Sequence, residues 1–215
     1  MKVGILGSGV VGQALGVGFA REGHDVKLGT RKPDDPKVVA WAQRAGARAS
    51  AGTFADAARV AELAVLATRW DGTENAIKLA DPKQLTGKIV IDVTNPLRFG
   101  EAGPPGLALG FNDSGGERVQ AWLPGAKVVK AFNTVNAAYM HQPALPGGPP
   151  DMFICGNDAG AKRAVSDICR TFGWQVTDIG AIDGARLLEP LAVLYVRVAI
   201  LTGSWDLAWK LLRKA

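Results

Sequence analysis

The chain has 215 residues, 47% of them hydrophobic and 21% charged, which is the balance of a globular protein with one sizeable core. The formal net charge is +5, but the cations are scattered and no basic run is interleaved with aromatic rings, so nucleic acid is not an expected partner. Two cysteines cannot build a disulfide framework, and no Cys or His cluster has metal-ligand spacing. We expect buried free thiols, no metal site and a reducing, cytoplasmic location.

Apolar runs typical of buried strands alternate with helical patterns in the first half of the chain. Strands are predicted over 2–6, 25–29, 61–68 and 88–93, and helices over 10–22, 35–45, 53–60 and 71–80. A long irregular stretch is expected over 95–116. Loops of that length at a strand end often build substrate pockets.

The second half continues the same rhythm. A strand is predicted over 127–132 that runs straight into a helix, followed by a strand over 152–155, a helix over 158–172 and a strand over 174–178. From about residue 184 the chain is expected to be mostly helical. Strands separated by helices predict an α/β fold, a Rossmann-type doubly wound, mostly parallel sheet with a C-terminal helical extension.

The apolar stretch over 187–203 is shorter than the ~20 residues that a bilayer requires, and it carries Glu189 and Arg197. We therefore expect a helix that is buried or covered by a second subunit, and no membrane span. An apolar helix of this length on a small domain favours a homodimer.

A glycine-rich segment follows the first strand and opens the first helix. Its pattern is G-x-G-x-x-G, and it consists of Gly7, Ser8, Gly9, Val10, Val11 and Gly12. In this context the first glycine permits a tight turn, the second lets the backbone approach a pyrophosphate, and the third lets the helix pack on the strand. The helix N-terminus supplies N–H groups for phosphates. The segment predicts a dinucleotide site.

The end of the second strand lacks the acidic residue that binds a ribose 2′-hydroxyl in NAD-specific folds. Thr30, Arg31 and Lys32 stand there instead. A guanidinium grips a phosphate with two hydrogen bonds, and Lys adds a point charge. The turn therefore predicts NADP rather than NAD; the alternative is a solvated cationic turn. We assign residues 1–180 to an NADP-binding Rossmann-like domain and 181–215 to the helical extension, packed on that domain or on a dimer partner.

Ligands of doubly wound sheets lie beyond the carboxyl ends of the strands. Trp70, after the third predicted strand, either covers the cofactor or belongs to the core. Lys130, at the end of a later strand, is expected to face water. The residues at strand ends that we expect to meet the cofactor, the last three at its nicotinamide end, are Thr68, Arg69, Asn95, Pro96 and Asn133.

No catalytic side chain is assigned, because no nucleophile stands in a motif with a base. Hydride transfer between two bound rings requires alignment and exclusion of water more than side-chain chemistry. We expect Phe132 and the C-terminal helices to hold a flat acceptor against the nicotinamide. His24, in the turn before the second strand, is expected to be structural.

The chain resembles the NADPH-dependent deazaflavin (coenzyme F420) reductase family, and the related oxidoreductase domain of six-transmembrane metalloreductases. The resemblance rests on "KVGILGSGVVGQALG", "GTRKP", "LAVLATRW", "VIDVTNP", "VVKAFNTV" and "ICGNDAGAK", in this order, and extends to "RLLEPLAVL". It implies a Rossmann fold with a small C-terminal part, often in homodimers. The NADP sites that it implies are Gly7 to Gly12, Thr30, Arg31, Lys32, Thr68, Arg69, Asn95 and Pro96.

The resemblance also bears on the acceptor. In the archaeal deazaflavin reductases a histidine stands where this chain has Asn133, and it helps to form the deazaflavin pocket. The metalloreductase relatives have Asn there and use a flavin. The resemblance therefore implies a deazaflavin (coenzyme F420) or a flavin (FMN or FAD) as the small-molecule acceptor of an NADP(H)-dependent oxidoreductase.

Two alternatives stay open. One is an NADPH-dependent reductase of a small imine or carbonyl substrate, which needs a proton donor near the nicotinamide; Tyr139 and His141 are its candidates. The other is a protein that binds NADP as a sensor and turns nothing over, because a Rossmann scaffold alone does not imply activity.

Overall fold

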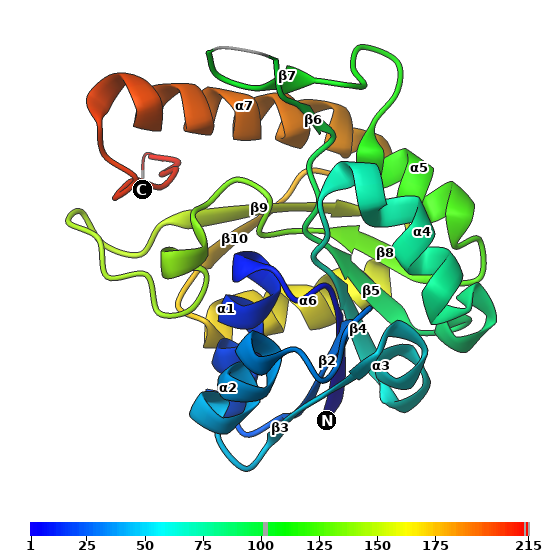
Figure 1. Cartoon of the computed structure of the whole chain (residues 1–215). Coiled ribbons are helices and arrows are strands. Elements are labelled where there is room, and N and C mark those ends of the chain that lie inside the picture. The colour runs from blue at the N-terminus through cyan, green and yellow to red at the C-terminus, as the bar shows by residue number, and fades with distance from the viewer. Residues whose placement is uncertain (101–102, 213, 215) are drawn as a thin grey trace.

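The centre of the computed structural model is an eight-stranded sheet (Figure 1). The structure describes residues 1–100, 103–212 and 214. The strands of this sheet are β1 (Lys2–Leu6), β2 (Asp25–Thr30), β3 (Ala49–Thr53), β4 (Leu63–Leu66), β5 (Ile89–Asp92), β8 (Lys127–Lys130), β9 (Asp151–Gly156) and β10 (Gln175–Asp178). Their order is β10-β9-β8-β5-β4-β1-β2-β3, and every pair is parallel except β8 and β9.

Helices cover both faces of the sheet, and each layer has its own apolar core (Figure 1). On one face lie α1 (Val10–Arg21), α2 (Pro36–Ala45) and α6 (Ala159–Thr171). On the other lie α3 (Phe54–Val60), α4 (Trp70–Ala80), the short turn η1 (Pro82–Leu85) and α5 (Gly115–Trp122). The strands β1 and β4 are buried on both faces, which explains why their sequences are mostly apolar and could be predicted as strands. The predicted fold class is confirmed.

The turn η3 (Ile182–Gly184) leads into α7 (Ala185–Thr202), whose first turns lie at the carboxyl ends of β5 and β8 and which then runs alongside β9 (Figure 1). A small hairpin of β6 (Leu97–Arg98) and β7 (Gly106–Leu107) runs beside it. One face of α7 is buried through Leu188, Ala192, Tyr195 and Ala199. Among the residues that the structure describes, no helix is long and apolar enough to cross a membrane.

Several local predictions were wrong. The sequence prediction missed β3, a partly exposed edge strand of small residues, and α5, which begins inside the stretch expected to be irregular. Instead of a helix directly after residue 132, the chain forms only the short turn η2 (Ala137–Tyr139). No helix of the described structure connects β8 to β9, and β9 pairs with β8 in antiparallel orientation.

The last segment also differs from the expected helix. The helix α7 ends at Thr202 and is capped by Gly203, whose φ of 67° is left-handed, and residues 204–212 have no regular structure. Hydrogen bonds hold this tail in place. The N–H of Asp151 donates to the carbonyl of Trp209 at 2.9 Å, and the Tyr195 hydroxyl donates to the carbonyl of Trp205 at 3.1 Å.

Candidate functional site

At two positions of the loop between β1 and α1, neighbouring backbone atoms of the protein leave room only for glycine. Gly7 has a φ of +132°, and a Cβ there would lie 2.2 Å from the carbonyl oxygen of Ala67. A Cβ on Gly12 would lie 2.0 Å from the carbonyl oxygen of Gly7. A larger residue at position 7 would clash with the backbone that follows β4, and one at position 12 would force α1 away from the loop that precedes it.

Gly9 differs from both. Its φ of −72° and ψ of 179° suit any residue, and a Cβ built on it would meet no atom within 4 Å. It is the N-cap of α1, no side chain caps the helix, and the first helical bond runs from Gln13 N to Gly9 O at 2.9 Å. The N–H groups of the first turn therefore end beside open space. Steric crowding within the protein gives no reason for a glycine at this position, whereas a phosphate that approaches the backbone does.

The cationic turn after β2 lies beside this loop. Ser8 Oγ donates to Thr30 Oγ1 at 3.1 Å, Lys32 N donates to the same oxygen at 3.3 Å, and Gly7 N donates to Gly29 O at 3.0 Å. Arg31 and Lys32 are exposed, and no carboxylate of the described part of the chain forms an ion pair with either. The glycine loop and the Thr30–Lys32 turn, which were predicted separately, therefore form one surface. The two cations of that surface have no carboxylate partner among the described residues.

The end of β4 carries the next pair of predicted residues. Thr68 shares a hydrogen bond with Thr73, with 2.9 Å between the hydroxyl oxygens. Arg69 is exposed, pairs with Asp71 at 3.0 Å and lies over the ring of Phe99 at 5.9 Å. Trp70 stacks on Trp122, with ring centroids 5.5 Å apart, and so packs α4 against α5. Of its two predicted roles, this contact favours the core.

Asn95 and Asn133, from the ends of β5 and β8, pair directly. Asn95 Nδ2 donates to the carbonyl of Asn133 at 2.8 Å, and Asn133 Nδ2 donates to Asn95 Oδ1 at 3.0 Å and to the carbonyl of Leu188 at 3.0 Å. The carbonyl of Leu188 can only accept, so the orientation of the Asn133 amide is fixed. Its Oδ1 is buried without a hydrogen-bond partner. Pro96, the next predicted residue, is buried.

Two predictions at this edge were wrong. Lys130 does not face water: its side chain is fully buried, with Nζ 2.7 Å from Asp92 Oδ2 and 2.9 Å from Glu189 Oε1. Burial disfavours its charged form, but the two carboxylates outweigh burial and hold the pKa of Lys130 above its ordinary value. Sequence reasoning could not find this cluster, because Glu189 is distant in the chain.

Phe132 is not a platform for the acceptor. It is fully buried, has a left-handed φ of 60° and packs on Phe172 with ring centroids 5.9 Å apart. Such backbone strain in a bulky residue persists only where the surroundings fix it. The ring anchors the start of the segment that presents Asn133.

The two candidate proton donors have other partners. His141 Nε2 lies 2.7 Å from Glu22 Oε1, at the end of α1 remote from the glycine loop, which is roughly 15–20 Å away along the helix at 1.5 Å per residue. The Tyr139 hydroxyl donates to Asp206, and this carboxylate raises the pKa of Tyr139. Among the hydrogen bonds of the described residues, neither side chain is a partner of Asn95 or Asn133. His24 bonds the N-terminal amine at 3.4 Å, which fits the structural role predicted for it.

Both cysteines are free and buried, as predicted. Burial raises the pKa of Cys155 to about 12 and raises that of Cys169 further. At pH 8, below both pKa values, the thiols are protonated. We expect a disulfide reagent such as DTNB to label neither thiol of the folded protein and both after denaturation. Rapid labelling without unfolding would contradict this prediction.

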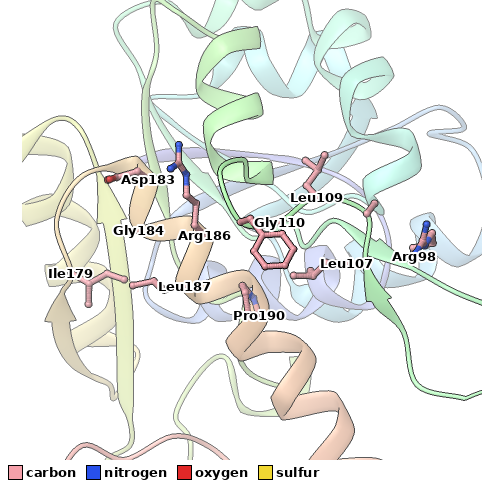
Figure 2. Close-up of a pocket in the computed structure, with 12 residues that line it drawn as sticks. Arg98, Leu107, Leu109, Gly110, Ile179, Asp183, Gly184, Arg186, Leu187 and Pro190 are labelled. Atoms are coloured by element: carbon pink, nitrogen blue, oxygen red, sulfur yellow. The ribbon is translucent and has the colours of Figure 1, made fainter.

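A cavity of about 850 Å³ lies between the β6–β7 hairpin and the first turns of α7. Figure 2 shows Arg98 and Leu107 on the hairpin side and Arg186, Leu187 and Pro190 on the helix side. None of the predicted cofactor-binding residues lines this cavity. Sequence reasoning missed its lining residues, although the length of the connection after β5 was a signal for a pocket.

Comparisons with known proteins bear on this geometry. A family model described as NADP oxidoreductase, coenzyme F420-dependent, matches residues 2–96. The crystal structure of a putative F420-dependent NADP reductase from Arthrobacter sp. FB24 is 37% identical, covers 99% of this chain and 100% of its own, and superposes with a TM-score of 0.94. The chain belongs to the coenzyme F420-dependent NADP oxidoreductase family.

Other members and relatives of this oxidoreductase family differ in length. An F420-dependent NADP reductase of Methanocaldococcus jannaschii is 29% identical over 210 residues, which are 93% of either chain. Metalloreductase STEAP3 of Rattus norvegicus is 32% identical over 208 residues, 90% of this chain but 37% of its own length. The chain therefore spans little more than a third of the metalloreductases that it matches. The resemblance inferred from the sequence segments is confirmed.

Proposed function

We propose that this protein is an NADP(H)-dependent oxidoreductase that transfers a hydride between the nicotinamide and a flat ring acceptor. Deazaflavin coenzyme F420 is the first candidate acceptor, and FMN or FAD the second. The observation that carries the proposal is the open space over Gly9 beside the unpaired cations of the Thr30–Lys32 turn. The same surface offers both the space that a pyrophosphate requires and the positive charge that a 2′-phosphate requires.

The residues present fit NADP(H). We propose that the loop from Gly7 to Gly12 holds the pyrophosphate through backbone N–H groups, and that Thr30, Arg31 and Lys32 bind the 2′-phosphate. Thr68 and Arg69 would border the middle of the dinucleotide, and Asn95, Pro96 and Asn133 its nicotinamide end. When bound, the reduced nicotinamide supplies the hydride. The chain itself contributes alignment and exclusion of water.

The cavity beside α7 is the proposed place of the acceptor. It is bordered by apolar side chains such as Leu107, Leu187 and Pro190, and its volume of about 850 Å³ is within the usual range for small-molecule sites. We assign residues 1–180 to the NADP-binding domain and 181–215 to an extension that supplies this wall. The reduced, buried thiols fit a cytoplasmic location.

A spectroscopic screen tests the proposal. Loss of NADPH absorbance is followed with coenzyme F420, FMN, FAD, ferric chelates and a panel of imines, each offered separately. We expect turnover with coenzyme F420 or a flavin. Turnover of imines alone would support the imine reductase alternative, and tight NADPH binding with no turnover of any acceptor would support a sensor; either result would overturn the proposal.

We also propose a homodimer. The outer face of α7 exposes Leu194 and Leu201, whose exposed fractions are 47% and 74%. These positions recur at helical spacing and form a stripe that a two-fold partner would cover.

Light scattering tests the dimer. We expect the unmodified protein to have twice the chain mass at low micromolar concentration, and Leu194→Glu to have the mass of one chain, because a charge in an apolar interface is costly. Leu79→Glu is the matched control, because Leu79 is 46% exposed on α4 and lies outside the stripe. A monomeric unmodified protein would contradict the proposal.

A further inference from the structure

A fully buried ion cluster lies at the carboxyl edge of the sheet and joins three elements. Lys130 Nζ, at the end of β8, donates to Asp92 Oδ2 of β5 at 2.7 Å and to the carbonyl of Thr94 at 2.8 Å, and pairs with Glu189 Oε1 of α7 at 2.9 Å. The side chains of Lys130 and Asp92 are 0% exposed, and that of Glu189 is 2% exposed. All three ammonium protons therefore have an acceptor.

On the β5 side the cluster fixes the turn that presents Asn95. Asp92 Oδ1 accepts from the N–H of Thr94 at 2.9 Å and from its hydroxyl at 2.7 Å, while Lys130 holds the carbonyl of the same residue. All of the polar groups of Thr94 are thus held by two charged partners. The next residue is Asn95, whose amide pairs with Asn133.

On the helix side the cluster fixes α7. Glu189 Oε2 accepts from the N–H of Gly115 at 2.9 Å, and its Oε1 accepts from the N–H of Gly116 at 3.0 Å. The carboxylate therefore neutralises the start of α5 as well as Lys130. Its neighbours in α7 are Leu188, whose carbonyl holds Asn133, and Pro190, which lines the cavity.

We propose that Lys130, with Asp92 and Glu189, is a positioning cluster that sets the distance between the Asn95–Asn133 pair and the α7 wall of the cavity. This inference rests on the proposed function, because the two walls are where the nicotinamide and the acceptor would meet. The three side chains of the cluster are buried, so we expect them to touch neither ligand. The cluster fixes the two surfaces that do, and hydride transfer depends steeply on that distance.

Binding measurements separate positioning from simple stability. The ratio of the dissociation constant of 2′,5′-ADP, which lacks the nicotinamide half, to that of NADPH reports how well the nicotinamide end is held. We expect Glu189→Gln to lower this ratio at least about tenfold and to lower the rate of single-turnover hydride transfer about 10²-fold. The dissociation constant of 2′,5′-ADP is expected to change by less than about threefold, because its site lies at the glycine loop.

A second variant covers the case in which the single substitution prevents folding. Lys130→Met with Asp92→Asn and Glu189→Gln leaves no charge in the cluster, and such neutral replacements of buried ions often fold. We expect the same fall in the ratio. The control is Lys88→Met at the amino end of β5, where Nζ donates to the carbonyl of Ala58 at 2.9 Å; its ratio should stay unchanged.

The outcomes are distinct. An unchanged ratio in folded Glu189→Gln or in the charge-free variant would overturn the positioning role, as would equal weakening of both ligands. If the unmodified protein turns over no acceptor while the variants still lower the ratio, the proposed function fails and the positioning of the nicotinamide end stands.

Discussion

Arg31→Ala is expected to raise the dissociation constant of NADPH about 10²-fold and that of NADH less than threefold. Only NADPH carries the 2′-phosphate that the guanidinium can bind with two charge-assisted hydrogen bonds. Arg31 has no carboxylate partner among the described ion pairs, so it does not have to leave one in order to bind. Titration by nucleotide fluorescence at fixed ionic strength measures both constants, because salt screens an exposed site of this kind.

The matched control is Arg44→Ala in the last turn of α2, which removes another exposed arginine. It should leave both constants unchanged. Arg31→Lys should fall between the two, because an ammonium keeps the charge but loses the planar fork. Equal weakening of NADPH and NADH in Arg31→Ala would show that the turn does not read the 2′-phosphate.

Gly9→Ala is expected to weaken NADPH binding about 10²-fold while the free energy of unfolding changes by no more than about 1 kcal/mol. The new methyl group meets no atom of the protein, so the fold has no reason to change. It projects into the space where a pyrophosphate would approach the first turn of α1, and a phosphate displaced by a methyl group loses backbone hydrogen bonds. Calorimetric titration and thermal unfolding give the two quantities.

Two further glycines serve as comparisons. Gly72→Ala, in the first turn of α4 with no atom within 4 Å of the new Cβ, should stabilise the fold by no more than about 1 kcal/mol and leave NADPH binding unchanged. Gly12→Ala should destabilise the fold, because its Cβ would lie 2.0 Å from a backbone oxygen. Tight NADPH binding by Gly9→Ala would remove the main support for the proposed site.

The sequence by itself determined the fold class and one half of the site. β1, β4 and β5 are largely buried on both faces, so each is a mostly apolar run that can be recognised locally. The glycine loop and the Thr30–Lys32 turn are equally local, because each follows directly from a strand end. Their neighbourhood in space follows from the parallel pairing of β1 with β2.

Weak local signals explain the elements that were missed. β3 is an edge strand of small residues, half covered, and shows neither a continuous nor an alternating apolar pattern. α5 spans eight residues and begins with two glycines, and its start is held by Glu189, far along the chain. Its local start signal, the N-cap Ser114 whose hydroxyl accepts from the N–H of Glu117 at 3.2 Å, was not used in the sequence prediction.

Only the tertiary structure decided the environment of the charged and aromatic residues. Lys130 is the last residue of β8 and Phe132 follows the strand, and nothing local distinguishes a side chain there that faces water from one that faces the core. Lys130 is charged and buried because β5 and α7 bring Asp92 and Glu189 to within hydrogen-bond distance. The free energy of a buried charge depends on partners that the fold supplies, and this is the information that local sequence patterns lack.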